Sequence, residues 1–301
     1  MKTISAWGAL LALLVPGGEL FAALDVWVTA PPQKFFVERV GGDAVKVRAL
    51  VRPGESPATY SPSASRMRAL AKADLYFAIG LPVEKAFFRT DGRNMPGLRI
   101  VRFGQTTHES AEVDHVPEAG EEDGGEEEDQ GHDHAHGHGE TDPHLWMDPV
   151  KMIAYTEVIA EALSEAQPEK AAMFRRNASE LTADLEVLHA ELQEQLSPFS
   201  GRAFYINHPA LGHFAERYGL KQFTIEHSGT KPSGRRIAEM IKEAREAGVG
   251  LVFTQPEFGR GSANILARAL DVQVVEIDPL AEDYMNNMRR LAELCARSFA
   301  R

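Results

Sequence analysis

The sequence predicts an α/β protein of two similar lobes, each with a mainly parallel sheet, joined by one long helix. Three observations support this fold class. Short apolar segments alternate with helical patterns over the first hundred residues, and the same alternation returns after residue 200. A continuous helical pattern separates the two series. A length of 301 residues also exceeds what one hydrophobic core usually accommodates.

The first series contains four apolar segments that have the length and composition of strands. The first of them, "LDVWVTA", alternates apolar side chains and stops at Pro31-Pro32. Glycine and proline punctuate most of the other segments, as expected where a strand or helix ends. We predict strands at 24–30, 45–51, 74–80 and 98–103, and helices at 34–42, 63–73 and 81–88.

Residues 106–141 interrupt this alternation. They have no apolar periodicity and are rich in Glu, Gly and His, which is typical of a disordered loop. Helical patterning resumes at Met152. It continues through residues 168–196, where Pro168 suits a first helical position. At 1.5 Å per residue such a helix is about 44 Å long, enough to cross from one lobe to the other.

The second series repeats the first. We predict strands at 202–208, 220–226, 249–255 and 272–278, helices at 209–219, 233–248 and 262–270, and a final C-terminal helix. The expected organisation is a signal peptide over 1–23, an N-terminal lobe with the acidic loop over 24–149, linking helices over 150–200, and a C-terminal lobe over 201–301.

The first residues read as an export signal. Lys2 precedes the apolar run "ISAWGALLALLV", Pro16 follows the run, and Ala22 and Ala23 offer cleavage points. The single cysteine, Cys295, lies in a helical pattern near the C-terminus, so neither a disulfide nor a lipid-bearing cysteine at the cleavage site is expected. We therefore expect a soluble periplasmic protein without a lipid anchor.

The net charge of −12 is concentrated in one place. The window 109–142 holds 14 acidic residues and no Lys or Arg, and removing those charges leaves a net charge of +2. The remainder therefore has no basic surface on which to argue nucleic-acid binding.

Three residues are candidates for chemistry because they follow predicted strands or lie in a turn between elements. His208 follows "FYIN", Asp278 follows "VVEI", and His144 lies in "TDPHLWMDP". Imidazole and carboxylate suit a divalent first-row metal, and ligands in open α/β sheets bind beyond the carboxyl ends of strands. From spacing alone the simpler explanation for each residue is a loop or turn former.

Five segments occur in this order: "PGESPATYSPSASRM", "TDPHLWMDP", "YINHPALGHFAERYGL", "TQPEFGRGSANILA" and "IDPL". Together they resemble the successive blocks of the metal-specific solute-binding proteins of ABC transporters, in the zinc- and manganese-uptake group. The resemblance covers 24–301 and implies two α/β lobes on one long helix, with a single dication between the lobes. It implies His144, His208 and Asp278 as ligands, with the histidine at 208 favouring zinc over manganese.

The chain departs from that pattern at Ala58. The family usually has a ligating histidine there, within P-H-T-Y, whereas this chain reads P-A-T-Y. Two histidines and an aspartate leave one tetrahedral position for water, for Glu55 or His227, or for a histidine of the loop. An open position is also the mark of catalytic zinc sites.

His132, His134, His136 and His138 alternate at the end of the acidic loop, shortly before His144. Neutral imidazoles bind zinc, and the surrounding carboxylates raise the local cation concentration. We interpret these histidines as an auxiliary metal-collecting loop, of a kind found in zinc-uptake members of the family. The other interpretation is a solvated low-complexity tract without a role.

The resulting hypothesis is a monomeric binding protein, not an enzyme, that passes Zn²⁺ to an inner-membrane ABC permease and its ATPase. The rivals are a manganese or iron transporter, a metal buffer without a transporter, and a secreted zinc hydrolase using the open position. The sequence contains no motif such as H-E-x-x-H, which argues against the hydrolase. We expect His213, five residues after His208 on the predicted helix, to point away from the site.

Overall fold

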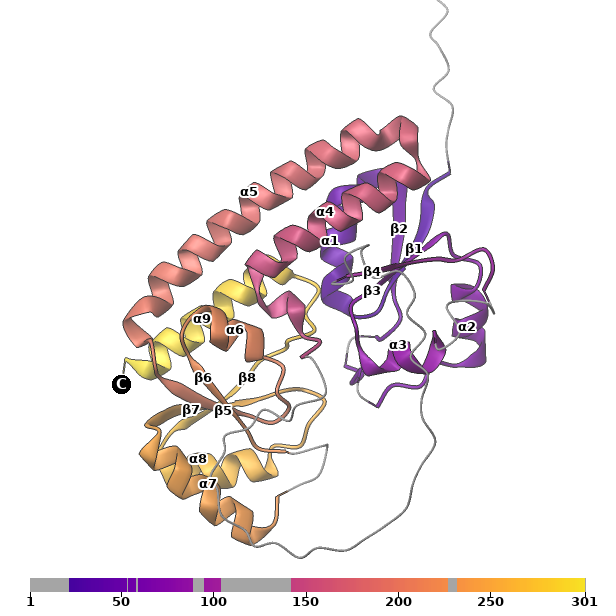
Figure 1. Ribbon diagram of the computed structural model, residues 1–301. Coiled ribbons are helices and arrows are strands. Elements are labelled where there is room, and N and C mark those ends of the chain that lie inside the picture. The colour runs from indigo at the N-terminus through magenta and orange to yellow at the C-terminus, as the bar shows by residue number, and fades with distance from the viewer. Residues whose placement is uncertain are drawn as a thin grey trace, which may run out of the picture.

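The computed structural model describes residues 22–52, 54–57, 59–88, 95–103, 142–226 and 232–300. The acidic, histidine-rich loop and nearly all of the expected signal peptide lie outside these ranges, as do Ala58 and His227. The described residues form two sheets, and a pair of long helices runs along one side of the molecule from one sheet to the other (Figure 1).

The N-terminal lobe is built on a four-stranded parallel sheet with the order β2-β1-β3-β4. The two central strands are the most buried, as expected where helices cover both faces of a parallel sheet. Its first helix begins at Pro31, three residues before the predicted start, because proline is well suited to a first helical turn. The elements are β1 (Leu24–Val28), α1 (Pro31–Gly41), β2 (Val45–Ala49), α2 (Ala64–Leu70), β3 (Leu75–Ala78), α3 (Pro82–Phe87) and β4 (Arg99–Arg102).

The C-terminal lobe repeats this design. Its sheet is also parallel and has the corresponding order β6-β5-β7-β8. The elements are β5 (Ala203–Ile206), α6 (Gly212–Arg217), β6 (Lys221–Thr224), α7 (Gly234–Glu246), β7 (Val249–Thr254), α8 (Gly261–Leu270), β8 (Gln273–Glu276) and α9 (Tyr284–Phe299). The predicted fold class, two similar parallel α/β lobes, is confirmed.

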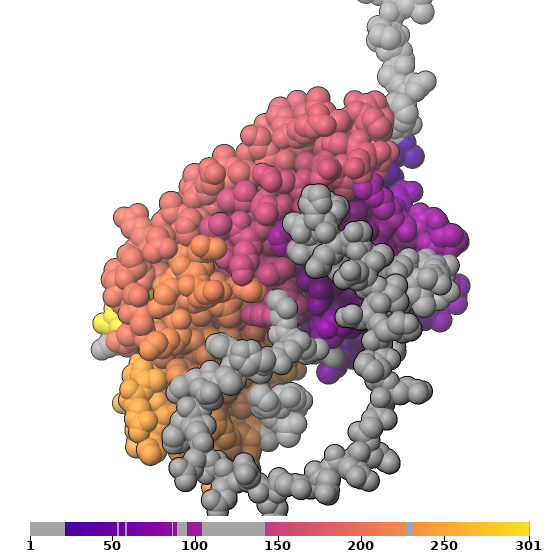
Figure 2. Space-filling model, viewed as in Figure 1, coloured from indigo at the N-terminus to yellow at the C-terminus, as the bar shows by residue number. Residues whose placement is uncertain are grey.

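Two helices join the lobes. α4 (Pro149–Ala166) packs along α5 (Ala171–Leu196), which also contacts α1 of one lobe and α9 of the other (Figures 1 and 2). The 26 residues of α5 correspond to about 39 Å. The helix begins later than predicted because a 3₁₀ turn, Pro168–Lys170, takes its first positions. One apolar stripe faces the protein: Phe174, Ala178, Leu181, Leu185, Leu188, Leu192 and Leu196.

The buried apolar side chains continue from one lobe to the other. A single cluster runs from the N-terminal sheet through α4 and α5 to one face of the C-terminal sheet, while a second lies under α7 and α8. Tyr284 of α9 stacks on Phe35 and meets Phe36 edge-on, so aromatic rings of the two lobes are in direct contact. Cys295 of α9 is buried in this core. This shared core favours limited movement between the lobes.

Among the helices that the structure describes, none combines the length and the apolar character needed to cross a membrane.

Candidate functional site

A cavity of about 720 Å³ opens between the two lobes, beyond the carboxyl ends of the strands. Such edges of parallel sheets are where open α/β folds bind ligands. The linking segment and loops from both lobes line it. Its lining includes Ser56, Pro57, Gly80, Leu81, Pro82, Asp142, His144, His208, Gly212, His213, Gln255, Glu257, Phe258, Pro279 and Leu280.

Two predicted ligands meet in this cavity. The Nε2 atoms of His144 and His208 lie 3.3 Å apart, with the rings crossed at 74°. Two nitrogens bound to one tetrahedral zinc ion at about 2.0–2.1 Å are themselves about 3.3–3.4 Å apart. The pair therefore has the separation expected of two ligands of one zinc ion, and in the metal-free protein one nitrogen can donate a hydrogen bond to the other.

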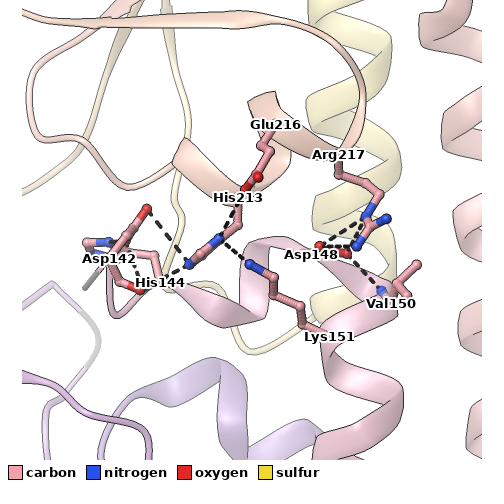
Figure 3. Close-up of polar contacts among 8 residues, drawn as sticks. All are labelled: Asp142, His144, Asp148, Val150, Lys151, His213, Glu216 and Arg217. Atoms are coloured by element: carbon pink, nitrogen blue, oxygen red, sulfur yellow. Dashed lines mark hydrogen bonds and ion pairs between the residues drawn. The ribbon is translucent and has the colours of Figure 1, made fainter. Parts of the chain in front are cut away.

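Asp142 fixes the orientation of His144. Its Oδ1 accepts hydrogen bonds from the Nδ1–H of the imidazole, at 2.7 Å, and from the His144 backbone N–H, at 3.0 Å (Figure 3). Burial acts to raise the pKa of Asp142, but these hydrogen bonds and the charge of His144 hold the pKa below its ordinary value. A proton on Nδ1 leaves the Nε2 lone pair of His144 free for a metal.

His208 is held from both sides by the loop after β7. Its backbone N–H donates to Gln255 Oε1 at 2.9 Å, its carbonyl accepts from Gln255 Nε2 at 3.3 Å, and its ring stacks on Phe258. Burial, reinforced by the charge of His144, lowers the pKa of His208 to about 4, against the opposing effect of Asp142. The imidazole is therefore neutral at physiological pH and keeps a lone pair.

Asp278, the third predicted ligand, does not join the two histidines. Its Oδ1 accepts from the Leu280 backbone N–H at 2.8 Å, closing a turn. The residue lines a separate cavity of about 240 Å³, beside Asn287 and Arg290. Within the described ranges, no three His, Cys, Asp or Glu side chains lie close enough together to hold a metal ion.

Of the residues predicted as alternatives for a fourth ligand, only Glu55 lies within the described ranges. Glu55 is not among the residues that line the cavity, although Ser56 and Pro57 are; its carboxylate accepts from the Arg52 backbone N–H. His227 and the histidines of the loop, His132, His134, His136 and His138, lie outside the described residues.

The expectation that His213 points away from the site is wrong. It lines the cavity, its Nε2–H donates to the backbone carbonyl of Asp142 at 3.0 Å, and its Nδ1 accepts from Lys151 Nζ at 2.7 Å (Figure 3). The expectation assumed a helix from residue 209, whereas α6 begins at Gly212. Spacing on one continuous helix was therefore not a valid guide to direction.

A buried ion pair fixes the helices behind the site. Asp148 caps α4 by accepting from the Val150 backbone N–H, and Arg217 of α6 donates to both carboxylate oxygens (Figure 3). The Asp148 side chain is only 2% exposed. This pair brings the first turn of α4, which carries Lys151, against the helix that carries His213.

Several residues around the candidate site were not predicted. Asp142 was counted only within the acidic run, and Lys151, Gln255 and Phe258 were not singled out. One signal was available for Asp142: a carboxylate two residues before a histidine is well placed to accept from its ring or backbone. For the other three, only the packing of distant elements reveals the contact.

A family model described as the periplasmic component A of a zinc-uptake complex matches residues 26–297. A Chlamydia muridarum protein described as metal-binding is 28% identical over 277 residues, 92% of each chain. The zinc-binding lipoprotein AdcA of Streptococcus pneumoniae serotype 4 is 29% identical over 263 residues, 85% of this chain and 50% of AdcA. The chain thus spans about half the length of that relative.

Solved structures agree in fold. A crystal structure of ZnuA superposes with a TM-score of 0.76 and 28% identity, covering 92% of this chain and 99% of ZnuA. A zinc-bound deletion mutant of ZnuA gives a TM-score of 0.75 and 29% identity, with 92% and 98% coverage.

Proposed function

The chain belongs to the family of periplasmic zinc-uptake components, and on that premise we propose that it captures Zn²⁺ between its lobes for delivery to an ABC importer. The approach of His144 Nε2 to His208 Nε2, at 3.3 Å, carries the proposal. The His144 ring is held by its hydrogen bond to Asp142 and the His208 ring by stacking on Phe258, and the two Nε2 atoms face each other. The zinc ion is the cargo, and the protein's work is binding and release.

Asp278 completes the ligand set in this proposal by turning its carboxylate toward the histidines. The next two residues, Pro279 and Leu280, already line the cavity, so the main chain at 278 lies beside it. The hydrogen bond from the Leu280 N–H to Oδ1 has to yield or be shared in this movement. Water, His227 or a histidine of the loop takes the fourth position.

The donor set favours zinc. Two neutral imidazoles and one carboxylate make an N₂O set, which binds zinc more tightly than manganese along the first-row series. Manganese or iron transport remains the competing assignment within the family. Competition between the metals under anaerobic conditions distinguishes them: zinc is expected to displace manganese at equal concentration.

The cellular setting follows from the family and the leading segment. We place the protein in the periplasm, where an inner-membrane permease and its ATPase accept the ion. The histidines of the acidic segment, His132, His134, His136 and His138, collect metal in this proposal. Removing residues 121–138 is expected to lower the number of zinc ions bound per chain, while the cleft ion stays.

The direct test is a zinc titration of the metal-free protein against a chelator of known affinity. The chain that lacks residues 121–138 is expected to bind one zinc ion tightly. His144→Ala in the same shortened chain is expected to bind zinc at least about 100-fold more weakly, because a ligand is lost. His189→Ala, which alters a histidine of α5 outside the cavity, is the matched control. Equal zinc affinity in His144→Ala and His189→Ala would contradict the proposal.

A further inference from the structure

His213 contacts the segment that carries His144 without contacting His144 itself. Its Nε2–H donates to the Asp142 carbonyl, and the same nitrogen lies 4.0 Å from Asp142 Oδ2. The Asp142 carboxylate in turn accepts from the ring and the backbone of His144. Hydrogen bonds therefore lead from α4, at Lys151, through α6 to the imidazole of His144 (Figure 3).

Both ring nitrogens of His213 are engaged. Lys151 carries no acceptor, so it donates to Nδ1 and fixes the other proton on Nε2. That proton points at the Asp142 carbonyl at 3.0 Å. Both nitrogens of His213 are therefore taken up by these two hydrogen bonds, and no lone pair is turned to the histidine pair. In this arrangement neither nitrogen of His213 is available to replace the ligand missing at Ala58.

The residue before His213 makes a second, independent contact with Asp142. A Cβ placed on Gly212 would overlap Asp142 Oδ2, so the carboxylate is seated directly against the backbone at the start of α6. The backbone angle of Gly212 is not one that requires glycine, since Gly212 is absent from the positive-φ residues of the described chain. Close approach, and not chain conformation, explains glycine here.

We propose that Gly212 and His213 form a seat for Asp142 and that His213 is a positioning residue for the metal ligand His144. Asp142 Oδ2 lies against Gly212, and the Asp142 carbonyl accepts a hydrogen bond from His213. Oδ1 is then left facing the His144 ring. His144 then keeps its proton on Nδ1 and presents the Nε2 lone pair to the ion. This inference rests on the proposed zinc site.

The test compares His213→Phe, which removes both hydrogen bonds, with His213→Gln, whose amide can donate to the carbonyl and accept from Lys151. Partners that orient a metal ligand are worth about 10–100-fold in affinity. His213→Phe is expected to bind zinc about 10-fold more weakly, and His213→Gln within about 3-fold of wild type. His189→Phe is the matched control and is expected to keep wild-type affinity; His189 lies on α5 and its ring hydrogen-bonds Tyr218 outside the cavity.

A spectroscopic readout separates positioning from general damage. Two-bond ¹H–¹⁵N correlation spectra of the zinc-free protein at pH 8 report which nitrogen of His144 carries the proton. Wild type and His213→Gln are expected to show the Nδ1–H form, and His213→Phe a mixture of both forms. The absorption bands of the Co²⁺-loaded protein are expected to keep their positions in His213→Phe, because no ligand changes.

Gly212→Ala probes the seat from the other side. Alanine is the better helix former, so weakened zinc binding with undiminished thermal stability is the expected result. Unchanged affinity and an unchanged His144 tautomer in both His213→Phe and Gly212→Ala would overturn the inference. Altered Co²⁺ bands in His213→Phe would also overturn it, since His213 would then be a ligand. Neither result touches the proposed function, which fails only if His144→Ala binds zinc like wild type.

Discussion

The two lobes share one strand order, but their edges facing the cavity are built differently. β1 and β5 occupy the same place in their sheets. Thr29, after β1, is fully buried and hydrogen-bonds Tyr76 and the carboxylate of Glu84. His208, two residues after β5, instead turns its ring into the cavity.

The polar groups of the N-terminal edge stabilise the fold, whereas those of the C-terminal edge belong to the candidate site. Glu84 accepts from the backbone N–H groups of Ile79 and Gly80, at 2.9 and 2.8 Å, and so fixes the loop that forms the N-terminal wall. The C-terminal edge carries His208, His213 and Gln255, whose polar groups serve the candidate site. Changes on the first edge should therefore cost stability, and changes on the second should cost affinity.

Substituting one residue on each edge tests this division most strongly. His208→Ala is expected to weaken zinc binding at least about 100-fold, with the free energy of unfolding of the metal-free protein changed by less than about 1 kcal/mol. Thr29→Val is expected to lower that free energy by about 1–3 kcal/mol, because Tyr76 and Glu84 lose a buried partner, with zinc affinity within about 3-fold. Chelator competition and urea unfolding measure the two quantities. If Thr29→Val loses more affinity than stability, the comparison is wrong.

The C-terminal edge is fixed from the linking helix, through Arg217 and Asp148. Arg217→Met is expected to lower the free energy of unfolding by about 3 kcal/mol, because it strands a buried carboxylate; the value is at the low end for buried pairs since Arg217 is one-third exposed. Arg235→Met, which breaks an exposed pair with Glu239, is the control and should cost less than about 0.5 kcal/mol. A loss below 1 kcal/mol for Arg217→Met would contradict this account.

The sequence predicted the fold because its local signals agree with the tertiary structure. All eight strands and the long helix occur where alternation, glycine and proline placed them, within a few residues at the ends. The errors have local causes. Pro31 starts a helix instead of only ending a strand, and the turn 209–211 delays α6.

The site was only partly predictable. His144 and His208 were found because one lies in a turn and the other follows a strand, each within a block that resembles the family, and the structure brings them together. Asp278 lay in an equally specific block, yet its carboxylate closes a turn through Leu280. Its placement as a ligand remains a proposal. Side-chain direction and contacts between distant helices, as for His213 and Lys151, are set by packing that one-dimensional spacing does not encode.

The buried carboxyl of the N-terminal edge gives a pH test. Burial raises the pKa of Glu84 above its ordinary value of 4.5, although hydrogen bonds from Ile79, Thr29 and Gly80 oppose the change. The folded protein then keeps a proton that the unfolded chain has lost, so this group's contribution to stability falls as pH rises from 4.5 through the raised pKa. Glu84→Gln cannot ionise, and urea unfolding from pH 4.5 to about pH 8 should show a flatter profile than wild type. A steeper profile in the variant would reverse the assignment.

The smallest expected effect concerns how the lobes are attached to α5. Arg39 of α1 pairs with Asp184, and Arg289 of α9 pairs with Glu191, each about half exposed. Exposed pairs contribute about 0.2–1 kcal/mol, and the apolar stripe of α5 is the larger attachment. Double-mutant cycles on both pairs should therefore give similar coupling energies below about 1 kcal/mol, falling further at high salt. A coupling energy well above this on one side only would mean that the lobes differ in their attachment to α5 as well as in their cavity edges.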